Sequence, residues 1–495
     1  MLSPKSLDII HDLFAVTQRE SVVHPNSDAS KRFQGEVYEQ LAELDYIYVD
    51  ESALSAVDDS SAIESPAAGD YVSIGDFFEG LAQLATLGMV EVTDIVEAIH
   101  REVILRPIGR FNDLNLNKWQ KGLTGRIYGT VRYMMLLVGK NLATVFRLYK
   151  TAINQQTARP VTGAVKQLVN VLNGVMGDHL VTHKNPIALP MVLYNRDGKP
   201  QSGEIVGRAV VLCHGLCLSY LSWQSFDNDG LGEKVFRSQP ETTVLYLDYN
   251  TGRRISRNGR SLSKVLQDLL DHNPNISQID LVGHSMGGLV ARSALFYGKQ
   301  DGLEWVKRVG NLVTLGSPHH GAILERIGFF VQEVIARLPF ANALAKLGDL
   351  RSAGIIDLRH GSIRDADWKS MEGRSVLPQE FRHPARLPRH INTYLVAATL
   401  VEGHYDSMAT SLLGDGLVTV ESALGDHEGE HALLVPERHK AVFYGVGHMS
   451  LIYNERVQQQ VVAWLLDNGK SRFDVEADAL GTRIHSYPDK FNVAI

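Results

Sequence analysis

One ten-residue segment constrains the fold of this chain more than any other: Ile279-Asp280-Leu281-Val282-Gly283-His284-Ser285-Met286-Gly287-Gly288. Its apolar start is typical of a buried strand, and residues 289–295 continue with the composition of a helix. The pattern G-x-S-x-G between them predicts a sharp strand-to-helix turn with Ser285 at its tip. We therefore expect a parallel sheet flanked by helices, with the Ser285 hydroxyl held at its carboxyl edge. The alternative is a plain Gly-Ser turn.

A serine hydroxyl becomes an effective nucleophile only when a base accepts its proton and hydrogen-bond donors stabilise the oxyanion. The expected donors follow an apolar run at residues 209–213, which ends in His214-Gly215-Leu216. We expect the backbone N–H groups of Leu216 and Met286 to form this oxyanion hole. An ordinary glycine turn after the strand is the alternative.

A carboxylate that orients the base is expected on the loop after a strand predicted at residues 393–398. Asp415, between two glycines, is the preferred candidate, and Asp406 on the same loop competes with it. The alternative for Asp415 is that its side chain only closes an Asx-turn.

The base is expected after the last predicted strand, residues 441–446, where Gly447-His448 follows. The chain order Ser285, Asp415, His448 is that of α/β-hydrolases. It differs from the orders found in chymotrypsin-type and subtilisin-type proteases.

Five segments together resemble the lipase and esterase branch of the α/β-hydrolase family: LVGHSMGG, VLCHGL, VTLGSPHHG, GDGLV and the late Gly-His pair. The most similar groups are bacterial triacylglycerol lipases and inositol-deacylase-like hydrolases, and the similarity spans about residues 186–470. It implies an α/β-hydrolase fold and carboxylic-ester hydrolysis through an acyl-enzyme. The implied triad is Ser285, Asp415 and His448, with Leu216 and Met286 as oxyanion donors.

No metal and no cofactor are expected. Bacterial lipases of this type often hold a structural calcium with an aspartate soon after the catalytic histidine, whereas this chain has Met449-Ser450-Leu451-Ile452 there. The segment His427-Glu428-Gly429-Glu430-His431 lacks helical H-E-x-x-H spacing and is interpreted as a solvated loop. His319 and His320 follow a predicted strand and are placed at the mouth of the pocket without a catalytic role.

The alternation of strands and helices breaks between residues 321 and about 388, which predicts a helical cap or lid insertion. An apolar stripe runs along its start: Ile323, Ile327, Phe330, Val331, Val334 and Leu338. Such a face can bind acyl chains, or it can be the core contact of a rigid cap. The candidate substrate-binding residues are His214, Phe330, Val331 and Val334.

The expected domain organisation has three parts. Residues 1–185 form a mostly helical region with an exposed connector at 50–70, residues 186–470 form the catalytic domain, and 471–495 form a tail. Apolar stripes predict helices over 127–149 and 165–176. Because basic residues dot the first of these, it can lie on a membrane surface, or both can pack on the hydrolase domain or on a second copy of the chain.

The composition of the chain limits the kinds of partner and cellular location that we expect. A net charge of −7 over 495 residues argues against nucleic acid as an electrostatic partner. No apolar run reaches membrane-spanning length, and the N-terminus lacks the pattern of a signal peptide. Cys213 and Cys217, the chain's two cysteines, are interpreted as packed thiols. We therefore expect a cytoplasmic protein, with peripheral membrane contact left open.

The sequence thus predicts a serine carboxylic-ester hydrolase that acts on acyl esters or lipids. Two alternatives remain. An acyltransferase or thioesterase would use the same triad with another acceptor or substrate. A non-catalytic hydrolase-fold protein would bind an apolar ligand or a partner instead.

Overall fold

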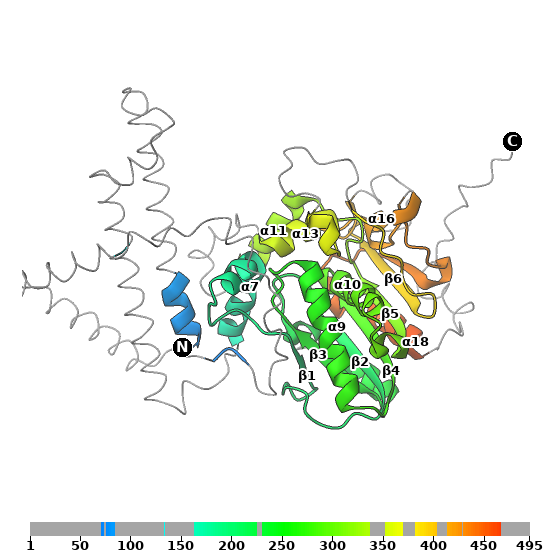
Figure 1. The fold of residues 1–495 in the computed structure, drawn as a ribbon. Coiled ribbons are helices and arrows are strands. Elements are labelled where there is room, and N and C mark those ends of the chain that lie inside the picture. The colour runs from blue at the N-terminus through cyan, green and yellow to red at the C-terminus, as the bar shows by residue number, and fades with distance from the viewer. Residues whose placement is uncertain are drawn as a thin grey trace, which may run out of the picture. The chain divides into compact units, whose positions relative to one another are not determined.

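The apolar runs of the sequence form the strands of one sheet (Figure 1). The computed structural model describes residues 71–73, 76–84, 133, 163–224, 230–336, 352–369, 382–402, 413–427 and 429–466, all within the second of two compact units, Ser65–Ile495. The strands are β1 (Val192–Tyr194), β2 (Gly207–Cys213), β3 (Thr243–Asp248), β4 (Ile276–His284), β5 (Val309–Leu315), β6 (Asn392–Thr399) and β7 (Lys440–Tyr444).

The strand order is β1-β3-β2-β4-β5-β6-β7. β1 pairs with β3 in the antiparallel sense, and every other pair in this sheet is parallel. The expected mostly parallel sheet of an α/β-hydrolase is therefore confirmed. Since β2, β4, β5, β6 and β7 run in the same direction, the loops that carry the predicted site leave the sheet at one edge.

Alternate side chains of the strands enter two different hydrophobic cores. Val211 and Leu281 belong to one core, whereas Val210 and Val282 belong to the other. Both pairs are fully buried, because helices cover the two faces of the sheet. This explains why the strand sequences are continuous apolar runs.

Helices on the first face contribute to the first core: α7 (Gly163–Thr182), α9 (Ile255–His272), α10 (Met286–Gln300), α11 (Leu324–Ala336) and α13 (Ala353–His360). Figure 1 shows α9 and α10 side by side in front of the strands, and these two helices pack against each other. The second face is covered by η3 (Tyr220–Trp223), α8 (Leu231–Ser238), α17 (Ser450–Tyr453) and α18 (Glu455–Leu466). The remaining short helices are η4 (Glu304–Arg308), α14 (Asp365–Lys369), α16 (Val420–Ala423), η6 (Gly429–His431) and η7 (Glu437–His439).

The predicted stripe over 165–176 forms part of α7, which is buried from two sides. Val171 and Val175 belong to the first core. Val169 and Leu172 instead pack with Phe77, from a helical segment at residues 76–84. The described part of α7 therefore packs on the hydrolase domain, as one of the two hypotheses for these helices predicted. The stripe over 127–149, the connector at 50–70 and the tail at 471–495 lie outside the described residues, apart from Tyr133 in a helix.

The expected insertion follows β5 and contains α11, α13 and α14 among its described residues. Ile327, Phe330 and Val331 on α11 are buried in the first core, while Ile323 is 46% exposed. Leu338, the end of the predicted stripe, lies outside the described residues. Within the described part of the chain, no helix combines the length and apolar character needed to cross a membrane.

Candidate active site

Ser285 occupies the sharp turn that the G-x-S-x-G pattern predicts. It follows β4, precedes α10, and has φ 54° and ψ −123°, a left-handed conformation that is costly for a residue with a Cβ. The turn needs glycines on both sides because the backbone is crowded there. A Cβ on Gly283 would lie 2.4 Å from the Gly288 nitrogen, and one on Gly287 would lie 2.2 Å from the Cys213 carbonyl oxygen.

His448 and Asp415 form a hydrogen-bonded pair. The Nδ1 atom of His448 lies 2.7 Å from Oδ2 of Asp415, and both side chains are at least 95% buried. The backbone reinforces this pairing, because the His448 N–H donates to the Asp415 carbonyl oxygen over 2.9 Å. A carboxylate at this distance orients the ring with Nδ1 protonated, which leaves Nε2 as the basic atom.

The two readings of Asp415, an orienting acid or an Asx-turn, apply to different oxygens of the same carboxylate. Oδ1 accepts hydrogen bonds from the backbone N–H groups of Leu417 and Val418, at 3.0 and 2.8 Å. Oδ2 is left for His448. The turn therefore holds the carboxylate in the orientation in which it contacts the histidine. The competing acid, Asp406, lies outside the described residues.

The two atoms that would exchange a proton both lack a hydrogen-bond partner among the described residues. These atoms, Ser285 Oγ and His448 Nε2, are both buried. Hydrogen bonds between a nucleophile and its base are often loose in a free enzyme and tighten when substrate binds. The arrangement thus offers a buried hydroxyl and a buried imidazole nitrogen to an incoming carbonyl group.

His284 was not singled out in the sequence, yet it lies against the candidate base. Its ring centroid is 4.8 Å from that of His448, and its Nε2 is 3.0 Å from the His448 carbonyl oxygen. Burial, followed by the nearby His448, holds the pKa of His284 well below its ordinary value, so the ring is neutral. A neutral imidazole donates from Nε2 to that carbonyl group. The only sequence signal was its place inside the G-x-S-x-G pattern.

The loop that carries Leu216 lies against the serine turn. A Cβ on Gly215 would lie 3.0 Å from the Ser285 Cβ, so the backbone of this loop passes next to the nucleophile. Leu216 and Met286 are both almost fully buried, and Met286 opens α10. The two predicted oxyanion donors thus belong to segments that meet at Ser285.

His214 precedes this loop, and its side chain contacts Tyr249 and Asp248. Its side chain is fully buried and stacks on Tyr249, with ring centroids 4.6 Å apart. Its Nε2 lies 3.4 Å from Oδ1 of Asp248, whose Oδ2 accepts from the Lys166 ammonium at 2.5 Å. These contacts favour a supporting role for His214 over the substrate contact predicted from the sequence.

The pair of Lys166 and Asp248 connects α7 to the end of β3. Both side chains are more than 90% buried. Burial opposes ionisation of Asp248, but Lys166 and His214 overcome it and lower its pKa to about 2. A charged carboxylate therefore lies next to His214, at the start of the predicted oxyanion loop.

The insertion contacts the candidate base through Phe330. The rings of Phe330 and His448 meet edge to face, with centroids 5.7 Å apart. Val331 is buried in the first core, and Val334 packs against that core while partly exposed. Of the three predicted pocket residues on α11, Phe330 is therefore the one placed against the triad.

The described residues hold no cluster of three or more histidine, cysteine or acidic side chains suited to a metal ion. Glu428 of the His427–His431 segment lies outside them. Cys213 and Cys217 are free and buried, and burial raises the pKa of each thiol to about 12. The prediction of two packed thiols is confirmed.

Comparisons with known proteins agree with this fold. Residues 204–427 match the family model described as PGAP1-like alpha/beta domain; this segment contains Ser285 and Asp415 and ends before His448. A comparison with curated proteins finds no match. The matched segment lies within the part of the chain that forms the sheet, and the sheet topology is that of an α/β-hydrolase fold.

Solved structures similar to the chain include three lipases and esterases. Bacillus licheniformis lipase BlEst2 in mature form is 19% identical, with 56% of this chain and 97% of that chain covered and a TM-score of 0.34. Carboxylesterase CesB (YbfK) from Bacillus subtilis is 17% identical, with 60% and 98% covered and a TM-score of 0.32. Aspergillus fumigatus lipase B is 14% identical, with 52% of each chain covered and a TM-score of 0.30.

Proposed function

We propose that this chain, whose described core has an α/β-hydrolase fold, hydrolyses carboxylic esters through an acyl-enzyme formed on Ser285. The observation that carries the proposal is the buried His448–Asp415 pair, at 2.7 Å, at the same sheet edge as the strained Ser285 turn. With Nδ1 facing Asp415, Nε2 of His448 is the ring atom that can take a proton from serine. Acyl esters or lipids are the proposed substrates, since Phe330 places an apolar ring beside the base.

In the proposed reaction, His448 Nε2 accepts the Ser285 proton while Oγ attacks the ester carbonyl carbon. The N–H groups of Leu216 and Met286 stabilise the tetrahedral oxyanion. The intermediate expels the alcohol, which takes the proton from His448. Water then loses a proton to His448 and attacks the acyl-enzyme, which releases the carboxylic acid and restores Ser285. Throughout, Asp415 stabilises the imidazolium that forms transiently.

Hydrolysis of p-nitrophenyl esters from acetate to palmitate tests the proposal. We expect turnover by the wild type, loss of turnover in Ser285→Ala with the fold intact, and inhibition by a serine-directed fluorophosphonate. The preferred chain length would size the acyl pocket. Covalent labelling of Ser285 without turnover would favour the acyltransferase or thioesterase alternative, because the nucleophile would be reactive towards another substrate or acceptor. Substantial esterase activity in Ser285→Ala would overturn the assignment.

A further inference from the structure

A cavity lies beside α10, and its lining is strongly basic. It has a volume of about 840 Å³, and its described lining residues do not include Ser285, Asp415 or His448. Five arginines line it against two carboxylates, those of Asp367 and Glu430. The arginines are Arg292, Arg382, Arg386, Arg389 and Arg438. The lining thus has three more arginines than carboxylates, in a chain whose net charge is −7.

Arg292 is the buried member of this set. It is 7% exposed and forms no ion pair with a carboxylate of the described residues. Its Nη1 donates to Nδ1 of His319 at 3.1 Å, its Nη2 makes a long contact of 3.5 Å with the Ala385 carbonyl oxygen, and its Nε has no partner among the described residues. A buried guanidinium without a counter-charge is costly unless an anion binds beside it.

Neither carboxylate of the cavity forms an ion pair with Arg292 among the described residues, although Asp367 acts on its charge from a distance. Asp367 is 1% exposed and accepts hydrogen bonds from the backbone N–H groups of Ile363, Arg364 and His383. Glu430 lies 4.0 Å from Arg386, and both side chains are more than 70% exposed, so water screens their attraction.

Two histidines of the cavity are kept neutral, chiefly by burial and also by the neighbouring arginines. Burial, followed by the charge of Arg292, holds the pKa of His319 well below its ordinary value, and burial with Arg382 and Arg292 lowers that of His320 to about 3. Neutral His319 accepts from Arg292 at Nδ1 and donates from Nε2 to Thr314. Burial and Arg382, opposed by Asp367, lower the pKa of Arg292 to about 10, which leaves it charged at neutral pH.

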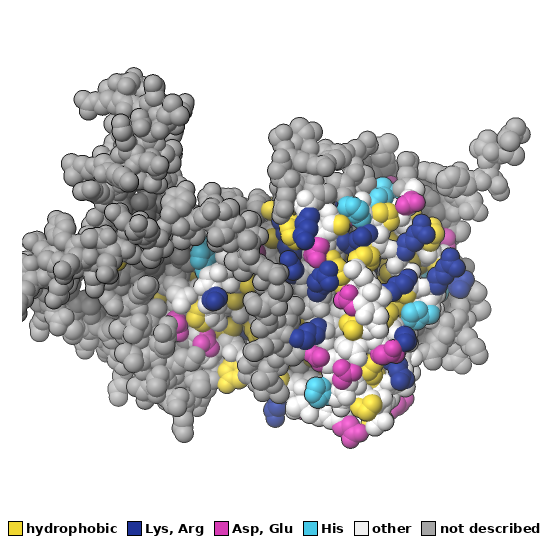
Figure 2. Space-filling view, in the orientation of Figure 1, with side chains coloured by type: hydrophobic (Ala, Val, Ile, Leu, Met, Phe, Trp, Pro, Cys, Tyr) yellow, Lys and Arg dark blue, Asp and Glu magenta, His cyan; other side chains and the backbone are white. Residues whose placement is uncertain are grey.

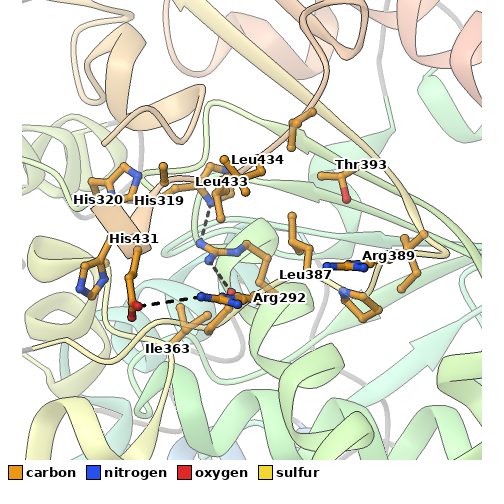
Figure 3. A pocket seen from close by; sticks show the side chains of 18 of the residues that line it. Arg292, His319, His320, Ile363, Leu387, Arg389, Thr393, His431, Leu433 and Leu434 are labelled. Atoms are coloured by element: carbon orange, nitrogen blue, oxygen red, sulfur yellow. Dashed lines mark hydrogen bonds and ion pairs between the residues drawn. The ribbon is translucent and has the colours of Figure 1, made fainter. Parts of the chain in front are cut away.

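A further polar group without a partner faces the same space. The Thr393 hydroxyl is buried and has no hydrogen-bond partner among the described residues. In Figure 3, Arg292 lies between His319, His320 and His431 on one side and Arg389 and Thr393 on the other. Figure 2 shows Lys and Arg side chains, with histidines among them, gathered over the upper right of the described surface.

We propose that this cavity binds a phosphate ester. Guanidinium groups match phosphate oxygens in charge and geometry, and three arginine charges in excess suit a polyvalent anion better than a single carboxylate. Arg292 and Arg382 contact the phosphate, Arg389 attracts it from the exposed rim, and Ile363, Leu387 and Leu433 contact the organic part.

Titration calorimetry on Ser285→Ala, which makes binding independent of hydrolysis, tests this site with phenyl phosphate as the probe. We expect one saturable site at which inorganic phosphate competes and benzoate binds more weakly. Arg292→Gln should weaken binding roughly ten-fold or more, since it removes a charge-assisted contact. Arg389→Gln should weaken binding by about two- to five-fold, since it removes an attracting charge from the exposed rim. Arg389 is exposed, so its variant reports on binding even if the buried Arg292→Gln destabilises the fold. Arg237→Gln on α8, also exposed and outside the cavity, is the matched control.

Sedimentation with phosphatidylcholine vesicles, with and without phosphatidic acid, separates the two sources of such a phosphate. Binding of phenyl phosphate that depends on Arg292 and Arg389 supports a soluble ligand. Binding only to vesicles that contain phosphatidic acid, lost in the same variants, supports a lipid headgroup. Binding of neither probe, or binding that both variants retain, would overturn the proposal whether or not the chain hydrolyses esters.

Discussion

At the scale of the residue, the candidate site depends on how one carboxylate is held. Asp415 uses Oδ1 for two backbone N–H groups and Oδ2 for His448, so its orientation is fixed before any substrate binds. Such preorganisation matters for the proposed reaction, because the imidazolium that would form during acyl transfer must be stabilised without rearrangement.

Replacing Asp415 with asparagine separates its two tasks. The amide oxygen can still close the turn, whereas the negative charge that faces His448 is lost. We expect Asp415→Asn to lower kcat by about 10³–10⁴-fold while the melting temperature stays close to that of the wild type. Asp197→Asn, in an exposed turn after β1, is the control. A loss below about ten-fold would mean that Asp415 serves the turn alone.

Gly316 offers a second residue-scale prediction, because it lies between β5 and the His–Asp pair. A Cβ at this position would lie 2.9 Å from Asp415 Oδ2 and 2.6 Å from the Leu451 Cδ1 atom, and φ is +57°. We expect Gly316→Ala to lower kcat by displacing the carboxylate. Gly302→Ala is matched to it, since φ there is +69° and nothing lies within 4 Å of the added atom. Both variants should lose about 1 kcal/mol of stability to backbone strain, measured by urea unfolding. Equal ester turnover in the two would contradict the steric argument.

At the scale of the element, α7 and β3 are joined by an ion pair that supports the predicted oxyanion loop. Lys166 lies in the first turn of α7 and Asp248 ends β3, with His214 facing the other carboxylate oxygen. Because both charges are buried, removing one partner leaves the other uncompensated, which costs about 3–5 kcal/mol for pairs of this kind.

This pair makes stability depend on pH in acid. The folded pKa of Asp248 is about 2, below its ordinary 3.8, so the ion pair contributes its full stabilisation above about pH 4. That contribution, about 2 kcal/mol, is lost as the pH falls through about 2. Urea unfolding at several pH values should show a steeper decline for the wild type than for Asp248→Asn between these limits. Parallel declines would mean that the carboxylate is not held in its charged form by Lys166.

The strands, the helices and their order could be predicted from the sequence. The contacts of Lys166, Asp248 and His214 that lie behind the site could not. Continuous apolar runs such as residues 209–213 predicted strands because both faces of this sheet are covered. The spacing of Leu168 and Leu172 predicted a helix because helical periodicity is local. The contact of Lys166 with Asp248 joins residues 82 positions apart, and no local pattern encodes it. His214 was predicted to meet substrate for the same reason, since its partner could not be read from its neighbours.

At the scale of the whole molecule, α7 connects two hydrophobic cores. Val171 and Val175 on α7 belong to the first core, while Val169 packs in a separate cluster with Phe77. The proposed boundary at residue 186 and the family match from residue 204 both exclude this helix. Its burial indicates that the hydrolase domain needs it for stability as well as for the Lys166 contact.

Two fragments compare these boundaries directly. A fragment of residues 186–495 would expose the core surface beneath Val171 and Val175 and leave Asp248 without its ammonium partner. Each lost buried valine costs roughly 1.5–3 kcal/mol of burial, so we expect this fragment to melt well below one of residues 160–495 or to aggregate. Differential scanning fluorimetry and p-nitrophenyl ester turnover would measure both effects. If the shorter fragment matched the longer one in melting temperature and turnover, α7 would be an accessory to the fold. The oxyanion loop would then hold its position without Lys166.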